Sequence, residues 1–262
     1  MRKFFSRAGI RVVGIRGIIG AGVQASVYHE LLDRLERDPK AGAVVLDIDS
    51  PGGAVGASED LYLKTKRLSK KKPVVAFIRG SGTSGAYLLA CAATRIIALP
   101  SAIVGSIGVI SMRPEASGLL DKLGVGFSVS KSGPLKDMGA FYRPPTDDEQ
   151  AKLQSLIDEL FEAFLQEVAE SRNMDLDEAR KYATGEVFTA RRAAETKLID
   201  ETGDFDKALD TAAELGKVPR RVKHLRPHRT LRQRMLGQFA MWSLEAALEG
   251  TDAANAPKLW YL

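Results

Sequence analysis

Cysteine, histidine and long hydrophobic runs are all scarce in this chain of 262 residues. The single cysteine, Cys91, excludes an internal disulfide framework, and its apolar neighbours predict a small buried residue rather than a reactive thiol. The three histidines and one cysteine form no metal-binding pattern, and no phosphate-binding glycine loop is followed by a lysine. We therefore expect neither a metal nor an organic cofactor.

No run of about 18 apolar residues and no secretory leader is visible in the sequence. These absences predict a protein that is cytoplasmic or membrane-associated at the surface, with no transmembrane segment or secretory signal in this chain. The formal net charge of +5 is concentrated in residues 217–234, which hold eight Lys or Arg and no acidic residue. That segment is predicted to be a solvated linker or a contact with an anionic membrane surface. No nucleic acid is expected as a partner, because no aromatic residue is interleaved with the charges.

Strand and helix patterns alternate along most of the chain, which predicts an α/β fold with parallel crossovers and a sheet covered on both faces. Strands are expected at 12–19, 44–48, 74–78, 96–99, 103–110 and 127–129. Helices are expected at 27–35, 58–68, 86–93, 115–123, 146–171, 176–182, 190–195 and 205–215. We expect one domain over residues 1–216 and a C-terminal extension, 217–262, made of a basic linker, an amphipathic helix and a flexible apolar tail. The long helix at 146–171 carries an apolar face that packs within its own chain or against another subunit.

Two glycine turns at the ends of neighbouring strands are the strongest functional signal. One is Ser50-Pro51-Gly52-Gly53, and the other, Gly80-Ser81-Gly82-Thr83-Ser84-Gly85, places a hydroxyl between a strand and a helix. Such turns can present a nucleophile and backbone N–H donors to one point, as acyl transfer requires. The plainer alternatives are a helix N-cap for Ser84 and a positive-φ turn for the glycines.

A serine nucleophile needs a base, and none of the histidines, His29, His224 and His228, has the setting of a fixed catalytic imidazole. A lysine can replace histidine where burial keeps its amine neutral. Lys136 follows a Ser-Gly-Pro turn and has apolar neighbours, which makes it one candidate among several. The turn around Ser84 only partly matches the nucleophile elbow of α/β-hydrolases, because Ala86 replaces the second glycine.

Four blocks in this order and spacing resemble the signal peptide peptidase A (SppA) family in its short, single-repeat form. They are Asp49-Ser50-Pro51-Gly52-Gly53, Thr83-Ser84-Gly85-Ala86-Tyr87, Gly105-Ser106-Ile107-Gly108-Val109-Ile110 and Lys131-Ser132-Gly133-Pro134-Leu135-Lys136-Asp137. Two later blocks, at 185–193 and 198–203, continue the similarity. The resemblance covers residues 12–215.

The resemblance implies a Clp-protease/crotonase-like fold and a serine protease with a Ser–Lys dyad. By position, Ser84 corresponds to the nucleophile and Lys136 to the general base. Gly53 and Gly85 correspond to the donors of the oxyanion hole, through their backbone N–H groups. Ser106 corresponds to a position near the dyad, where a hydroxyl would orient the lysine.

The resemblance also implies peptide substrates, namely short apolar peptides such as cleaved signal peptides, and a homo-oligomeric ring that shares each dyad between two subunits. Family members commonly carry an N-terminal transmembrane anchor, whereas the given sequence begins almost at its first expected strand. Three alternatives stay open: a crotonase-type acyl-CoA enzyme, an esterase that uses His224 or His228, and a non-catalytic membrane-associated scaffold. A further hypothesis places the apolar C-terminal tail, residues 259–262, in a substrate groove of its own or a neighbouring subunit.

Overall fold

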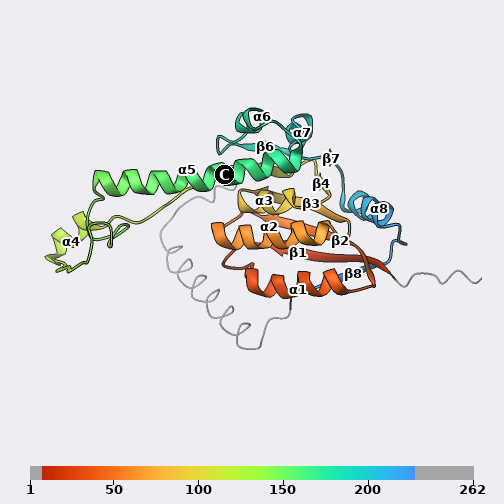
Figure 1. The fold of residues 1–262 in the computed structure, drawn as a ribbon, viewed down its shortest axis with the longest axis horizontal. Helices are drawn as coiled ribbons and strands as arrows, with labels where there is room; N and C mark the ends of the chain where they lie inside the picture. The colour runs from red at the N-terminus through yellow and green to blue at the C-terminus, as the bar shows by residue number, and fades with distance from the viewer. Residues whose placement is uncertain (1–7, 228–262) are drawn as a thin grey trace, which may run out of the picture. The chain divides into compact units, whose positions relative to one another are not determined.

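The computed structural model describes residues 8–227, whose elements alternate between strand and helix as the sequence predicts, except that two strands and then three helices follow one another in the middle (Figure 1). The strands are β1 (Gly9–Arg16), β2 (Ala41–Ser50), β3 (Val74–Thr83), β4 (Arg95–Ala98), β5 (Ile103–Gly105), β6 (Val187–Thr189), β7 (Glu201–Thr202) and β8 (Val222–Leu225). The helices are α1 (Ala25–Arg37), α2 (Val55–Ser69), α3 (Gly85–Cys91), α4 (Ser117–Leu123), α5 (Asp147–Arg172), α6 (Leu176–Arg180), α7 (Ala190–Glu195) and α8 (Phe205–Gly216).

One eight-stranded sheet forms the centre of this part of the chain. Its main order is β6-β5-β3-β2-β1-β8, and every pairing is parallel except that of β5 with β6. Strand β3 forks along one edge, since its first half pairs with β4 and its end pairs with β5. Ser50, at the end of β2, is paired with Gly82 near the end of β3. The two glycine turns therefore leave the sheet side by side.

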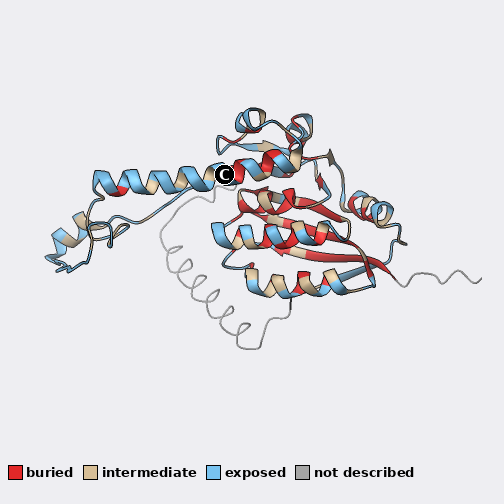
Figure 2. Cartoon of the chain, viewed as in Figure 1, coloured by how far each residue is buried: buried red, intermediate tan, exposed pale blue. Residues whose placement is uncertain are grey.

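Both faces of the sheet are covered, as the continuous apolar strands predict. Helices α1, α2 and α3 contribute to the core on one face, and α8 forms a smaller core on the other. Figure 2 shows the resulting buried strands and the exposed outer sides of the helices. Cys91 belongs to the larger core at 5% exposure, and burial raises the pKa of its thiol. The expectation of a buried, unreactive cysteine is consistent with both observations.

The long helix α5 begins where the sequence predicts, because Thr146 and Glu149 form a capping box. Its apolar face packs against α3 only in its second half, where Phe164, Leu165 and Val168 are buried. The first half stays largely exposed (Figure 2), and the apolar side chains in the middle of the helix, Leu156 and Leu160, are 37% and 41% exposed. Packing within its own chain therefore accounts for half of the predicted apolar face.

One predicted strand is absent from the structure, and another is shorter than predicted. Residues 127–129 form no strand, since Phe127 instead stacks on Tyr142, with ring centroids 4.8 Å apart, in a segment that pairs with no strand of the sheet. The strand expected at 103–110 ends at Gly105. The backbone turns there through the positive φ angles of Gly105 and Ser106, at 97° and 49°.

The predicted basic linker also contains secondary structure. Residues Val222–Leu225 form β8, which extends the sheet beside β1, and the compact unit reaches Leu225. Arg220 forms ion pairs with Asp206 and Asp210 on α8, so part of the basic charge is neutralised within the chain. The helix and apolar tail expected beyond this point, and His228, lie outside the described residues.

Candidate active site

Ser84 lies at the junction between β3 and α3, in a backbone conformation that is unfavourable for a residue with a side chain. Its φ and ψ are 52° and −127°, and its N–H donates to the carbonyl of Gly105 at 2.8 Å. Although Ser84 occupies the N-cap position, its hydroxyl makes no capping hydrogen bond. Capping therefore does not explain this serine. A strained backbone that fixes an uncommitted hydroxyl is typical of a functional position.

The two glycine turns touch each other beside Ser84. A Cβ atom added to Gly52 would lie 2.7 Å from the nitrogen of Gly85, and one added to Gly85 would overlap the side chain of Ser58 on α2. Gly52 and Gly53 also have φ angles of 95° and 154°, a region that disfavours side chains. Close approach of two backbones, and not only a tight turn, thus requires glycine here.

Backbone donors for an oxyanion are available at this junction. The N–H groups of Gly53 and Gly85 donate no hydrogen bond within residues 8–227. Both precede or open a helix, since α2 begins at Val55 and α3 at Gly85. The N-terminus of a helix carries partial positive charge, so both helices favour a negative charge at this point.

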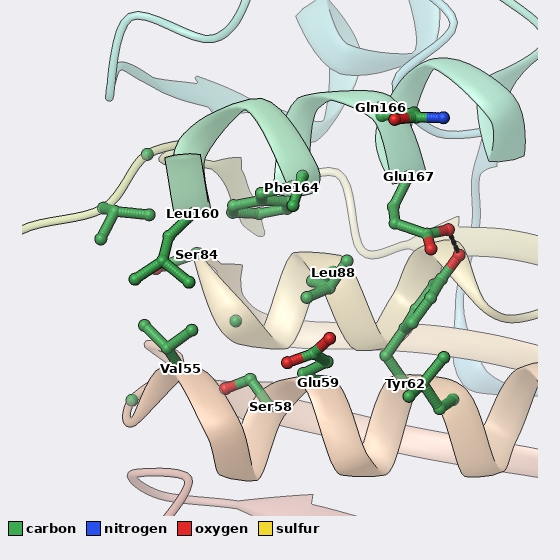
Figure 3. Close-up of a pocket in the computed structure, with 16 residues that line it drawn as sticks. Val55, Ser58, Glu59, Tyr62, Ser84, Leu88, Leu160, Phe164, Gln166 and Glu167 are labelled. Atoms are coloured by element: carbon green, nitrogen blue, oxygen red, sulfur yellow. Dashed lines mark hydrogen bonds between the residues drawn. The ribbon is translucent and has the colours of Figure 1, made fainter. Parts of the chain in front are cut away.

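A pocket of about 250 Å3 opens directly beside Ser84 and the two glycines. Figure 3 shows it between the first turns of α2, the start of α3 and the middle of α5. The apolar lining comes from Val55, Leu63, Leu88, Val109, Leu160, Ala163 and Phe164. The sequence analysis did not identify this pocket. Its only local signal is the helical spacing of Val55, Ser58, Glu59 and Tyr62 directly after a glycine turn.

Ser106 lies next to this junction but does not line the pocket. Its φ is 49°, its N–H donates to the carbonyl of Glu186 at 2.6 Å, and the preceding residue, Gly105, accepts the N–H of Ser84. The structure thus places the Ser106 backbone near the nucleophile position. No hydrogen bond of its hydroxyl is found in the described part of the chain.

Lys136 is exposed, in the segment between α4 and α5, and does not line the pocket that contains Ser84. Figure 1 shows α4 and the neighbouring chain at the end of α5 that is remote from the sheet. The burial expected for this lysine is therefore absent within one chain. The structure brings together Ser84, Gly53 and Gly85, and leaves Lys136 apart from them.

Ion pairs hold the segment that carries Lys136 to the start of α5. Arg143 bonds both Asp137 and Glu149, at 2.8 and 2.6 Å, and Lys131 bonds Asp137 at 2.7 Å. These cations lower the pKa of Asp137, Arg143 most strongly. The Arg143 guanidinium, with the N–H of Thr146, lowers the pKa of Glu149 to about 2.

We expect acid to loosen this segment only well below the ordinary carboxylate range. A lowered pKa means that the ion pair stabilises the fold fully above the ordinary value for Glu149, 4.5, and loses this effect as the pH falls toward about 2. The measurement is amide hydrogen exchange of residues 131–149 as a function of pH. The exchange rates are corrected for their intrinsic pH dependence, and the protection of this segment is compared with that of α3. A Glu149→Gln variant should already show the loosened segment at neutral pH. Equal protection in this variant and the wild type would contradict the role of the pair.

The histidines do not approach Ser84. His224 lies on β8 with its ring tilted against that of Phe205, at a centroid distance of 6.3 Å, while β1 and β2 separate β8 from β3. His29 lies on α1 and contacts Asp60 at 3.3 Å. Neither lines the pocket, so neither provides the base of an esterase within this chain. No group of metal-ligating side chains and no helix long and apolar enough to span a membrane is found among residues 8–227.

The model of peptidase family S49 matches residues 66–219. A candidate protease of Methanocaldococcus jannaschii is 40% identical over 74% of this chain and 62% of its own length. A candidate protease of Synechocystis is 37% identical, over 81% of this chain and 76% of its own. A protein of Enterococcus faecium, named as a candidate signal peptide peptidase SppA, is 32% identical over 69% of this chain and 53% of its own length. The chain thus spans between half and three quarters of these relatives.

Two solved structures show the same fold. A membrane-bound stomatin-specific protease, a variant in complex with a substrate peptide, has a TM-score of 0.55 at 17% identity, over 88% of this chain and 97% of its own. A variant of ClpP1 from Listeria monocytogenes has a TM-score of 0.52 at 16% identity, over 76% of this chain and 94% of its own. The predicted Clp-protease-like fold is therefore confirmed.

Proposed function

This chain belongs to peptidase family S49, and from that premise we propose that it is a serine endopeptidase with Ser84 as its nucleophile. One observation carries the proposal. The strained Ser84 lies beside two N–H groups that have no acceptor in the described chain, at the mouth of an apolar pocket. Electrostatic stabilisation of this kind is usually the largest single contribution to acyl-transfer catalysis.

The proposed reaction begins when the Ser84 hydroxyl attacks a peptide carbonyl and its proton passes to the neutral amine of Lys136. The oxyanion accepts hydrogen bonds from the N–H groups of Gly53 and Gly85. Lys136 then returns the proton to the leaving nitrogen as the C–N bond breaks. Water hydrolyses the acyl-enzyme, again with Lys136 as base, and Ser106 orients the lysine.

Lys136 is proposed to act on Ser84 of a neighbouring copy of this chain, in a homo-oligomeric ring. Its exposure at the remote end of α5 supports this arrangement. So does the exposed apolar surface of the segment between β5 and α5 that carries Lys136, which no other part of the described chain covers. The most exposed of these side chains are Ile110, Met112, Leu119 and Leu123, at 82%, 87%, 59% and 65%. Apolar surface of this extent is typical of an interface.

Short apolar peptides, such as cleaved signal peptides, are the proposed substrates. The apolar walls of the pocket support this class, because they can bury a side chain of the bound peptide. A peptide that lies extended along the sheet edge would add main-chain hydrogen bonds.

Labelling with a fluorophosphonate probe tests the nucleophile. We expect one covalent adduct per chain, located on Ser84 by peptide mass spectrometry and absent from Ser84→Ala. The probe mimics the acyl-transfer transition state, so it requires both an activated serine and the oxyanion donors. No adduct, together with no hydrolysis of apolar peptides, would instead favour a scaffold or an acyl-CoA enzyme. An adduct on another serine would overturn the assignment of Ser84.

A further inference from the structure

The pocket beside Ser84 is longer than a small side chain needs. It begins at Ser84 and Gly85 and runs between α2 and α5 toward Tyr62 and Glu167 (Figure 3). Its volume of about 250 Å3 exceeds what an alanine or valine side chain would fill. Because it adjoins the nucleophile and the oxyanion donors, it receives the residue whose carbonyl is attacked, the P1 residue. Small P1 side chains would leave most of it empty.

The polar groups at the far end of the pocket are already paired. The hydroxyl of Tyr62 donates to Glu167, and Lys66 bonds the same carboxylate at 2.6 Å. Gln166 donates to Glu170 at 3.3 Å. These groups close the far end of the pocket, where Tyr62 and Lys66 both bond the same oxygen of Glu167, Oε2.

Two adjacent groups on the first turns of α2 are not paired. The hydroxyl of Ser58 is buried, at 2% exposure of the residue, and has no hydrogen-bond partner. The Glu59 carboxylate is exposed and forms no ion pair or hydrogen bond with any other described residue. Figure 3 shows Glu59 below Leu88, directed into the space between α2 and α3. The Ser58 hydroxyl is covered by the backbone of Gly85, whereas the unpaired Glu59 carboxylate lines the pocket and favours a ligand that donates hydrogen bonds.

The charge of the described pocket lining is negative, since it includes two glutamates and no lysine or arginine. Of these two glutamates, only Glu167 is paired with Lys66. The walls above Glu59 are apolar, from Leu88, Leu160 and Phe164. A long aliphatic stem with a cationic end matches both properties, because such side chains bury their methylene groups and keep the charge near a partner.

We infer that Glu59 selects P1 residues with a long stem and a cationic end, arginine or lysine, within otherwise apolar peptides. The inference rests on the proposed function and names the substrate class of the same site. Glu59 binds the guanidinium or ammonium group at the wall of the pocket.

Two peptides that differ only at P1, arginine in one and its neutral isostere citrulline in the other, test this selectivity. The wild-type protein should cleave the arginine peptide with a kcat/KM about tenfold higher, as expected for one charge-assisted hydrogen bond at a partly exposed site. Glu59→Gln should bring the ratio of the two rates near one. High salt should lower the ratio in the wild type, because screening weakens an exposed pair. The ratio is measured within each protein, so any general change in activity cancels.

Glu30→Gln is the matched control, since it removes the same charge from an exposed position on α1, outside the pocket. Its ratio should equal that of the wild type. Ser84-dependent cleavage with equal rates for both peptides, or a ratio that Glu59→Gln leaves unchanged, would overturn the inference and leave the peptidase proposal intact. Failure of the wild type to cleave either peptide, with no fluorophosphonate adduct on Ser84, would overturn both.

Discussion

Co-expression of two inactive variants, Ser84→Ala and Lys136→Ala, is expected to restore peptide hydrolysis. Each variant alone should lose about 10^4-fold or more in kcat, because the members of a catalytic unit act together. In a mixed ring, a chain with intact Ser84 can lie beside a chain with intact Lys136. With random arrangement of head-to-tail neighbours, about one quarter of the sites then hold both groups.

Two different affinity tags on the variants allow mixed assemblies to be isolated, and fluorogenic peptide cleavage measures the recovered activity. Lys122→Ala is the matched control, since Lys122 is exposed on α4 in the same part of the chain. It should keep wild-type activity without a partner. Mixed assemblies that form and remain inactive would show that the dyad is not shared in this way. Full activity of Lys136→Ala alone would exclude this lysine as the base.

Replacing Gly53 with alanine is expected to lower kcat by about 100- to 1000-fold, the usual effect of losing one oxyanion donor. The new Cβ would lie 2.0 Å from the carbonyl oxygen of Ile19, at a φ of 154°, so the turn must move. That carbonyl accepts the N–H of Ala54 at 3.0 Å, and a moved turn would also weaken this bond. We therefore expect a lower melting temperature as well.

Gly56→Ala is the control within the same segment. Gly56 lies in α2, and an added Cβ meets nothing within 4 Å. This variant should keep full activity and gain up to about 1 kcal/mol of stability from the higher helix propensity of alanine. Steady-state kinetics and thermal unfolding of both variants provide the comparison. A folded Gly53→Ala protein with wild-type kcat would show that this N–H does not stabilise the oxyanion.

The sequence was sufficient to predict the convergence of the two glycine turns, because parallel neighbouring strands end at one edge of a sheet. That rule and the family resemblance together predict Ser84, Gly53 and Gly85 as neighbouring site residues. The strands of the sheet are also predictable where a continuous apolar run lies between helices, as in β2 and β3.

The remaining features depend on contacts between distant segments. The pocket joins α2 to α5, about a hundred positions later, so no local pattern contains it: Tyr62 meets Glu167 across 105 positions. Strand β8 could not be predicted from the sequence, because its lysine and histidine are typical of a solvated linker. Its partner, β1, also lies at the other end of the described chain. For Lys136, sequence proximity to apolar residues suggested burial, but Leu135 itself is 39% exposed. In the proposed ring, a neighbouring subunit would bury this lysine.

The length of α5 determines how far Lys136 is carried from its own sheet. With 26 residues at about 1.5 Å each, the helix is roughly 39 Å long. In the proposed ring, the length of α5 sets the spacing between successive active sites. Inserting or deleting one helical turn would shift the lysine by about 5 Å and rotate it little, so each ring size should tolerate only one helix length. Helix length would then decide whether Lys136 of one subunit can reach Ser84 of the next.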